Sequence, residues 1–202
     1  YLLMVAVSFA LGFALTYMFG YEDEAPVVAS ENATTERLVE EETTGNVPAS
    51  LQDETIISPI VGSAVALADV NDPVFSSGAM GQGIAIKPTE GVVYAPADAE
   101  VTIAFATGHA YGLKTANGAE ILIHVGIDTV SMNGEGFDQK VAQGDKVKAG
   151  DVLGTFDAAK IAAAGLEDTT MVIVTNTADF ASVTPVATGS VAKGDAIIEV
   201  KA

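Results

Sequence analysis

The chain carries two histidines, His109 and His124, and the residues around them suit an imidazole that takes part in chemistry. His124 lies in the run GAEILIHVGIDTV, residues 118–130, which follows an Ala-Asn-Gly turn and is rich in Ile, Leu and Val. This composition predicts a β-strand, in which successive side chains point to opposite faces. The core face is then formed by Ile121, Ile123, Val125 and Ile127. The opposite face carries Leu122, His124, Gly126 and Asp128.

The residues beside His124 leave its ring accessible. Gly126 has no side chain, so a large group can approach the imidazole. A histidine displayed in this way is a candidate nucleophile or metal ligand. His109 follows a second β-prone run, and antiparallel strands joined by a turn near Asn117–Gly118 would bring the two rings together. A purely structural role for both histidines is the alternative at this point.

Residues 118–130 resemble the active-site signature of the glucose-type enzyme IIA domain of the bacterial phosphoenolpyruvate-dependent sugar phosphotransferase system. That pattern requires Gly, two free positions, three apolar residues, His, apolar, Gly, apolar, a free position, Thr and apolar, and the run satisfies every position. The resemblance implies that His124 carries a phosphoryl group, that His109 stabilises it and that Thr107 orients the pair. Imidazole suits this role because it is nucleophilic when neutral and has an ordinary pKa of about 6.5.

The resemblance extends from about Ser58 to Val200, through blocks such as MGQGIAIKP (residues 80–88) and TGHAY (residues 107–111). One departure is Asp98-Ala99, where the family usually has Asp-Gly. If that turn has a positive φ, Ala99 is strained where glycine would not be.

The resemblance also implies a docking surface for partner proteins. The matching apolar residues are Val74, Phe75, Phe105, Leu122 and Val130. Two acidic residues, Asp72 and Asp128, match positions that face basic groups on the phosphocarrier protein HPr. An exposed apolar cluster with charged edges is typical of a transient interface. The alternative is that Phe75 and Phe105 are simply core residues.

The charged residues that could hold a phosphoryl group are few. The sole arginine, Arg37, lies outside the domain, so an arginine clamp is excluded within it. His109, Thr107 and backbone N–H groups must hold the phosphoryl oxygens unless the partner supplies positive charge. The resemblance implies no required cofactor. Two histidines and a carboxylate can also bind zinc. The resemblance makes an accessory zinc at His109 and His124, bridged by a partner's carboxylate, compatible with the site.

The sequence predicts an all-β domain of short, mostly antiparallel strands forming a sandwich or barrel. The expected strands are 60–67, 84–86, 92–94, 101–105, 121–127, 152–153, 171–174 and 197–200. One helix is expected from Asp157 to Gly165, with these two residues as its caps. The resemblance implies a jelly-roll-like fold related to biotinyl and lipoyl hybrid barrels. Three Gly-Asp turns, at Gly144, Gly150 and Gly194, echo those carrier domains, but no lysine tip for a cofactor accompanies them.

Charge and hydropathy divide the chain into three parts. The net charge of −18 disfavours nucleic-acid binding. Residues 1–21 hold no charged side chain and are long enough to span a bilayer, which predicts a transmembrane helix, with a buried core helix as the alternative. Residues 22–54 carry ten acidic side chains against one arginine, which predicts a flexible acidic linker. Residues 55–202 form the predicted domain.

Together these features predict the C-terminal part of a membrane permease of the β-glucoside, sucrose or trehalose type. Residues 14–23 resemble the last membrane helix of an enzyme IIC domain, so the IIA domain is expected on the cytoplasmic side of the cell membrane. His124 would accept a phosphoryl group from phospho-HPr and pass it to a cysteine of an enzyme IIB domain, which phosphorylates the sugar. The alternative function is a non-catalytic regulatory module that uses the same apolar surface.

Overall fold

The computed structural model describes residues 51–202, so the predicted transmembrane helix (1–21) and the predicted linker up to residue 50 lie outside the described residues. None of the helices formed by residues 51–202 combines the length and the apolar character that a membrane span needs. The described residues fold into a β-rich domain with a few short helices, which confirms the predicted all-β class.

The strands are short and pair antiparallel throughout residues 51–202. Their bounds are β1 Glu54–Ile57, β2 Gly62–Ala66, β3 Gln82–Pro88, β4 Val92–Tyr94, β5 Ala99–Ala104, β6 Ala110–Thr115, β7 Glu120–His124, β8 Phe137–Gln139, β9 Lys146–Val147, β10 Val152–Phe156, β11 Thr170–Val174, β12 Ser182–Pro185, β13 Gly189–Val191 and β14 Ala196–Lys201. The helical segments are η1 Leu67–Asp69, α2 Pro73–Ser76, η2 Thr129–Met132, α3 Ala158–Ala163 and η3 Thr177–Asp179.

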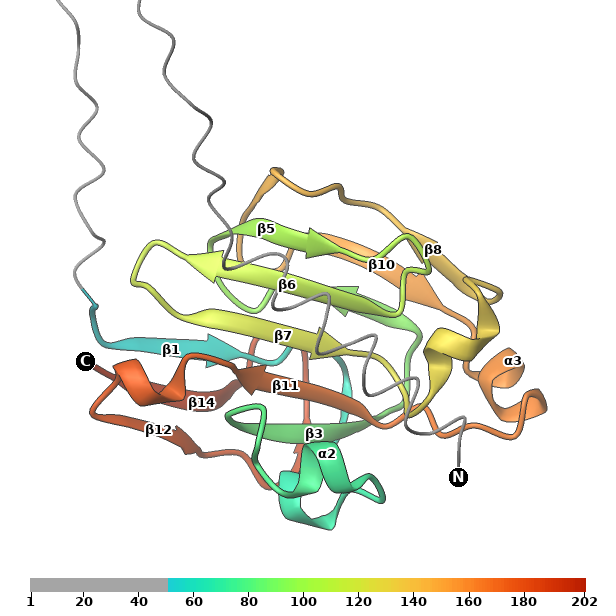
Figure 1. The fold of residues 1–202 in the computed structure, drawn as a ribbon, viewed down its shortest axis with the longest axis horizontal. Helices are drawn as coiled ribbons and strands as arrows, with labels where there is room; N and C mark the ends of the chain where they lie inside the picture. Colours follow the sequence, from blue (N-terminus) through green and yellow to red (C-terminus); the bar gives the residue numbers. More distant parts are fainter. Residues whose placement is uncertain (1–50) are drawn as a thin grey trace, which may run out of the picture. The chain divides into compact units, whose positions relative to one another are not determined.

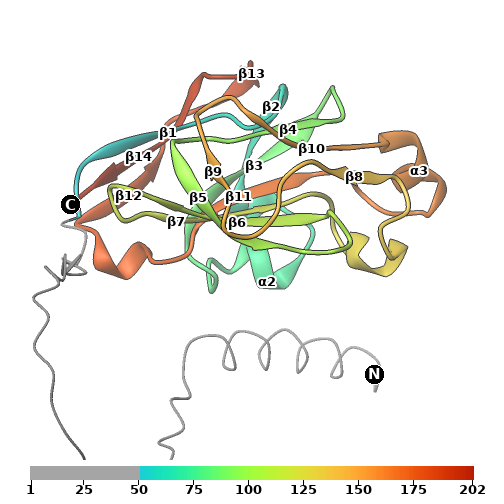
Figure 2. The same ribbon diagram turned by 90° about the horizontal axis from the view of Figure 1, so that it is seen from above.

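The strands of this domain form one large sheet and two small ones. The large sheet has the order β13-β2-β3-β11-β7-β6-β5-β9, and the small sheets have the orders β1-β14-β12 and β4-β10-β8. Figure 1 shows β5, β6, β7, β11 and β3 side by side, and Figure 2 shows the small sheets behind this layer. The strand β7 therefore lies near the middle of the large sheet, between β6 and β11.

The main hydrophobic core lies between the large sheet and the small ones. Ile121 and Ile123 of β7 enter it, as alternation predicts, and are at most 2% exposed. They share one cluster with Ile198 of β14 and Leu153 of β10, which belong to the two small sheets. Burial of these large aliphatic side chains is the main force that holds the layers together.

A second, smaller hydrophobic cluster covers part of the other face of the large sheet. Leu67 of η1 and Phe75 of α2 pack there against Met171 and Ile173 of β11, with half-buried Leu122 of β7 alongside. Because both of its faces are covered, every residue of β11 is buried. This second cluster explains why the face of β7 that carries His124 also carries a leucine.

Three sequence-based expectations need correction. The strand around His124 ends at that residue, so Ile127 is half-buried in the smaller cluster and does not belong to the core face. Ala99 begins β5 and is not among the non-glycine residues with positive φ in residues 51–202, so the expected strain is absent there. The first strand begins at Glu54, inside the predicted linker.

Asp53, the residue before Glu54, is also attached to the domain. The carboxylate of Asp53 accepts hydrogen bonds from Nζ of Lys201 at 3.0 Å and from the backbone N–H of Ala202 at 3.0 Å. Glu54 accepts one from the hydroxyl of Thr115 at 2.7 Å. These contacts explain why the folded part begins upstream of the composition change at Thr55.

The three Gly-Asp turns share one geometry. In each, the aspartate accepts a 2.8 Å hydrogen bond from the backbone N–H three residues earlier, and the preceding glycine has a φ of 88 to 91°. Each turn also exchanges two backbone hydrogen bonds with one residue elsewhere in the domain, namely Val101, Ala95 or Ser58. The three Gly-Asp stretches of this chain are therefore turns of one structural type.

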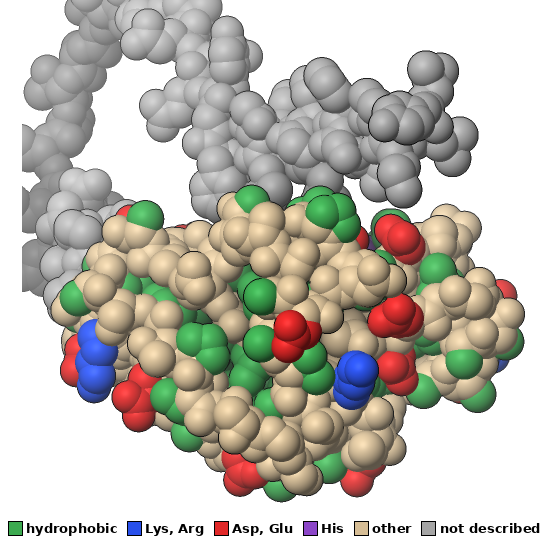
Figure 3. Space-filling model, turned by 90° about the horizontal axis from the view of Figure 1, so that it is seen from below, with side chains coloured by type: hydrophobic (Ala, Val, Ile, Leu, Met, Phe, Trp, Pro, Cys, Tyr) green, Lys and Arg blue, Asp and Glu red, His purple; other side chains and the backbone are tan. Residues whose placement is uncertain are grey.

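The predicted helix is present as α3, and Asp157 caps it by accepting from the N–H groups of Ala159 and Lys160. Its C-cap is Ala164, one residue earlier than expected, and Gly165 follows with a φ of 76°. Acidic and hydrophobic side chains are interspersed over the face drawn in Figure 3, where basic side chains are fewer.

Candidate active site

The two histidines meet at one end of the central strands. His124 is the last residue of β7, and its register partners are Ala110 at the start of β6 and Met171 in β11. His109 directly precedes β6, and its carbonyl accepts a hydrogen bond from the N–H of Val125 at 2.8 Å. The antiparallel pair joined at Asn117–Gly118 thus brings the rings together, with 5.0 Å between their centroids.

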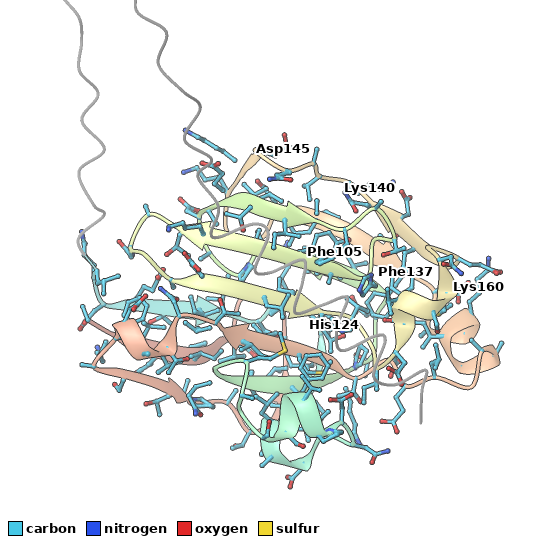
Figure 4. The ribbon with its side chains drawn as sticks, in the orientation of Figure 1. Phe105, His124, Phe137, Lys140, Asp145 and Lys160 are labelled. Carbon is cyan, nitrogen blue, oxygen red and sulfur yellow. The ribbon has the colours of Figure 1, made fainter. Side chains whose placement is uncertain are left out.

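The β5–β6 turn sets the position of His109. Gly108, with a φ of 68°, lets the chain reverse between Phe105 and His109. A Cβ atom at Gly108 would lie 3.0 Å from Cβ of Phe137, so β8 packs closely beneath this turn. Figure 4 shows Phe105, Phe137 and His124 towards the end of the sheet away from the start of β1.

A backbone carbonyl fixes the tautomer of His124. Nδ1 of His124 lies 2.8 Å from the carbonyl oxygen of Gly126. A carbonyl oxygen only accepts hydrogen bonds, so Nδ1 must carry the proton. In the neutral ring, Nε2 then holds the free lone pair and is the nucleophilic atom.

Thr107, to which the resemblance gives an orienting role, is hydrogen-bonded to the second ring. Its Oγ1 lies 2.6 Å from Nδ1 of His109. His109 is 4% exposed, whereas His124 is only half-buried, so His124 is the more accessible ring.

Two phenylalanines enclose the histidine pair. The ring of Phe75 lies 5.1 Å from that of His124, and the ring of Phe105 lies 5.3 Å from that of His109. The two imidazoles meet edge to face, at an interplanar angle of 80°. The four rings form a row that restricts how each imidazole can turn.

This apolar enclosure keeps both rings neutral. Burial, with a smaller contribution from the charge on His124, lowers the pKa of His109 to about 4. Burial also lowers the pKa of His124, while the hydrogen bond to Gly126 and the charges of Asp72 and Asp128 oppose the shift. Burial disfavours the charged form of an imidazole, so both rings are neutral at pH 7.

The residues of the expected docking surface differ in exposure. Val74 and Val130 are 46% and 45% exposed. Phe75 is 8% exposed and lies in the smaller hydrophobic cluster, which agrees with the alternative that it is a core residue. Phe105 and Leu122 are half-buried.

The two acidic residues of this surface flank the site. Asp128 is exposed and has a φ of 57°. The half-buried Asp72 caps α2 by accepting hydrogen bonds from the N–H groups of Val74 at 2.7 Å and Phe75 at 3.1 Å. That cap holds the helix that places Phe75 against His124.

The sequence did not predict the positions of the backbone groups beside His124. The Gly126 carbonyl holds the ring, and the next N–H, that of Ile127, donates to the Glu167 carbonyl at 2.9 Å. Thr129 is fully buried and donates from Oγ1 to the Val125 carbonyl at 2.5 Å. The signature contains Gly126 and Thr129, but a side-chain pattern does not reveal where carbonyl groups point.

Comparisons with known proteins agree with this geometry. A family model described as "phosphoenolpyruvate-dependent sugar phosphotransferase system, EIIA 1" matches residues 54–180. The solved structure of glucose permease IIA from Mycoplasma capricolum superposes with a TM-score of 0.69 at 35% identity, covering 73% of this chain and 96% of that one.

Two curated relatives illustrate the range of matching proteins. The beta-glucoside-specific EIIBCA component of Dickeya chrysanthemi is 44% identical over 186 residues, which cover 92% of this chain and 29% of the relative. The glucose-specific EIIA component of Bacillus cereus is 49% identical over 125 residues, which cover 62% of this chain and 76% of the relative. The chain thus spans less than a third of the EIIBCA relative.

Proposed function

The chain belongs to the EIIA 1 family of the phosphoenolpyruvate-dependent sugar phosphotransferase system, and we propose that Nε2 of His124 is its phosphoryl acceptor. The domain is a phosphotransferase component of sugar uptake. The hydrogen bond from Nδ1 to the Gly126 carbonyl is the observation that carries the assignment to Nε2, because it leaves that nitrogen as the free nucleophile.

The proposed transfer is an in-line displacement at phosphorus. The lone pair of Nε2 forms a new N–P bond while the bond between phosphorus and the donor nitrogen of phospho-HPr breaks, and the donor ring keeps that electron pair. In the second step a cysteine sulfur of an enzyme IIB domain attacks the same phosphorus, and His124 leaves as a neutral imidazole. Each step needs positioning more than covalent help from other residues.

His109 has a supporting role in this proposal. If the Thr107 hydroxyl donates to Nδ1 of His109, the ring carries its proton on Nε2 and can donate it to a phosphoryl oxygen. Residues 51–202 contain no arginine, so this donor, backbone N–H groups and the partner's cations must offset the phosphoryl charge.

The experiment separates the two histidines with radiolabelled phosphoenolpyruvate, enzyme I and HPr. His124→Ala should take up no label, because the nucleophile is gone. His109→Gln keeps an N–H donor but cannot titrate, so it should still take up label and lose about 10²–10³ in the rate of transfer to IIB. Label found on His109 in His124→Ala would overturn the assignment, and unimpaired transfer by His109→Gln would remove its supporting role.

We propose HPr as the donor that docks over the two exposed valines, Val74 and Val130, with Asp72 and Asp128 facing its basic groups. The comparisons do not favour the alternative, a non-catalytic regulatory module, because the family and its named relatives are phosphotransferase components.

We propose that the whole protein is a membrane permease with the IIA domain on the cytoplasmic side, with residues 1–21 as the last IIC helix and residues 22–50 as an acidic tether. Support comes from the EIIBCA relative, whose 186 aligned residues outnumber those of the folded domain. Enzyme IIB and IIC domains are then its partners in the same protein. Two relatives that match more than four fifths of the chain, from Dickeya chrysanthemi and Bacillus subtilis, are beta-glucoside-specific, so a β-glucoside is the sugar to test first.

An accessory zinc at His109 and His124 is compatible with the donor atoms. In residues 51–202 both rings make their hydrogen bonds through Nδ1. Both Nε2 atoms can ligate zinc when His109 carries its proton on Nδ1 and donates it to Oγ1 of Thr107, a tautomer other than the one that donates to a phosphoryl oxygen. No group of three His, Cys, Asp or Glu side chains is arranged to hold a metal in this part of the chain. We propose that a partner's carboxylate supplies a third ligand.

A further inference from the structure

Each peptide group between His124 and Ile127 makes at least one hydrogen bond that holds the backbone in place. The N–H of Val125 donates to the carbonyl of His109 at 2.8 Å, and the carbonyl of Val125 accepts from Oγ1 of Thr129 at 2.5 Å. In the next peptide, the Gly126 carbonyl accepts from the His124 ring and the N–H of Ile127 donates to the Glu167 carbonyl.

Thr129 also packs against Gly126 from one side. A Cβ atom on Gly126 would lie 2.4 Å from Cγ2 of Thr129 and 2.7 Å from the carbonyl oxygen of Glu167, so the glycine is confined between them. Its φ of 77° is one that glycine adopts readily and other residues do not. The Gly126 carbonyl therefore has little freedom to turn away from Nδ1 of His124.

Both parts of the threonine side chain contribute to this arrangement. Asp128, in the left-handed region at a φ of 57°, reverses the chain so that Thr129 returns to Val125. There the hydroxyl bonds the Val125 carbonyl and the methyl group fills the space beside Gly126. Thr129 is fully buried, so water does not compete for these contacts.

We propose that Thr129 is a positioning residue for phosphoryl transfer, which holds the Gly126 carbonyl against Nδ1 of His124 and so reserves Nε2 as the nucleophile. The inference deepens the proposed function and rests on it. As Nε2 bonds to phosphorus, the ring gains positive charge, and the Nδ1–H bond to the carbonyl becomes charge-assisted. A carbonyl held in place stabilises that charge without having to reorganise.

Two comparisons of variants at position 129 isolate the effect of the hydroxyl group. Thr129→Val keeps the shape and loses the hydroxyl, and Thr129→Ala compared with Thr129→Ser makes the same deletion in a smaller side chain. In the full chain, ring ¹⁵N NMR should show protonated Nδ1 for wild type and Thr129→Ser, and a mixture of tautomers for Thr129→Val and Thr129→Ala. Uptake of label from phospho-HPr should fall about tenfold in the two variants that lack the hydroxyl.

Thr115→Val is the matched control, because Thr115 is also buried and its hydroxyl also bonds within the domain, far along β6 from His124. It should lower the melting temperature and leave the His124 ring signals unchanged. If Thr129→Val or Thr129→Ala folds and keeps protonated Nδ1 with the wild-type rate, the proposal is wrong, and either pair alone decides the question. A wild-type chain that takes up no label would refute the proposed function, whereas the ring signals would still test Thr129.

Discussion

At the scale of residues, the site depends on imidazoles that stay neutral in an apolar enclosure. The proposed attack on phosphorus requires a neutral His124. Because burial lowers its pKa, the ring stays neutral even at pH values somewhat below about 6.5, the ordinary pKa of an imidazole. The row of Phe75, His124, His109 and Phe105 supplies the burial that produces this shift. The same burial lowers the free energy of unfolding at acidic pH, because both rings are readily protonated in the unfolded chain and not in the folded one.

This cost predicts a pH dependence of stability. The pKa of His109 is about 4 in the fold and about 6.5 in the unfolded chain, so between these values the unfolded state binds more protons. The free energy of unfolding should therefore be fully retained above pH 6.5 and decline as the pH falls towards 4. The full difference from His109 is on the order of 3 kcal/mol.

Urea unfolding of wild type and His109→Gln at pH 7.5 and 4.5 measures the contribution of His109 to the pH dependence of stability, since titration of the carboxylates is common to both proteins. The wild type should lose more stability between the two pH values than the variant does. Equal losses would show that the His109 ring is not held neutral by burial.

At the scale of elements, two short helical segments present the exposed apolar residues beside the histidines. The helix α2 turns Phe75 inward onto His124 and Val74 outward, and η2 carries Val130. Both segments are continuous with the site, because Asp72 caps the first and Asp128 precedes the second. A partner that docks on these valines would therefore lie directly beside His124, the proposed phosphoryl acceptor.

A charge on either valine should weaken donor docking. Val74→Asp and Val130→Asp should each raise the KM for phospho-HPr about tenfold with little change in kcat, because an apolar contact is lost and a carboxylate is desolvated. Val186→Asp is the matched control, since Val186 is 44% exposed and lies beyond β12. Steady-state phosphoryl transfer measures both constants. A similar KM increase in the control variant would argue against a localised docking surface.

The sequence predicted the elements that carry long apolar runs and missed those defined by their neighbours. The runs at 92–94, 171–174 and 197–200 correspond to β4, β11 and β14. The bounds of β6 were not predicted, although a strand was expected before the turn at Asn117–Gly118, because its sequence, AYGLKT, has a glycine and a lysine, and its pairing with β5 and β7 determines its structure. The helix α2 was missed because it is only four residues long.

The site was predicted to a similar extent. The signature identified His124, and the antiparallel pairing brought His109 beside it, as expected. The tautomer of His124 could not be predicted from the sequence, because it depends on where the Gly126 carbonyl points. The burial of Phe75 also depends on a contact between distant segments, α2 and β11, which no local pattern encodes.

At the scale of the whole molecule, the chain enters the domain at the end opposite the histidines. The N–H of Gln52 donates to the carbonyl of Asn117, and Leu51 packs against Gly118, just before β7 begins. His124 is at the other end of β7, six residues or about 20 Å further along. Figure 1 shows β1 starting at the same end of the sheet as the C-terminus. His124, the proposed phosphoryl acceptor, thus lies at the end of β7 opposite to the point where a tether would attach, which would leave it open to partners.

This arrangement predicts a single early site of proteolysis. Arg37 is the only tryptic site before Lys114, because Pro88 blocks cleavage after Lys87, and it lies in the acidic segment whose composition predicts a flexible tether. Trypsin should therefore cut the full chain first after Arg37, because proteases need backbone that can unfold locally. Lys146 and Lys193 are exposed as well and serve as internal controls, since their backbone belongs to a strand and a tight turn, respectively. Mass spectrometry of the early products should show residues 38–202 as one fragment, and that fragment should still take up label from phospho-HPr. Cleavage at these lysines as fast as at Arg37 would contradict the division of the chain into a tether and a folded domain.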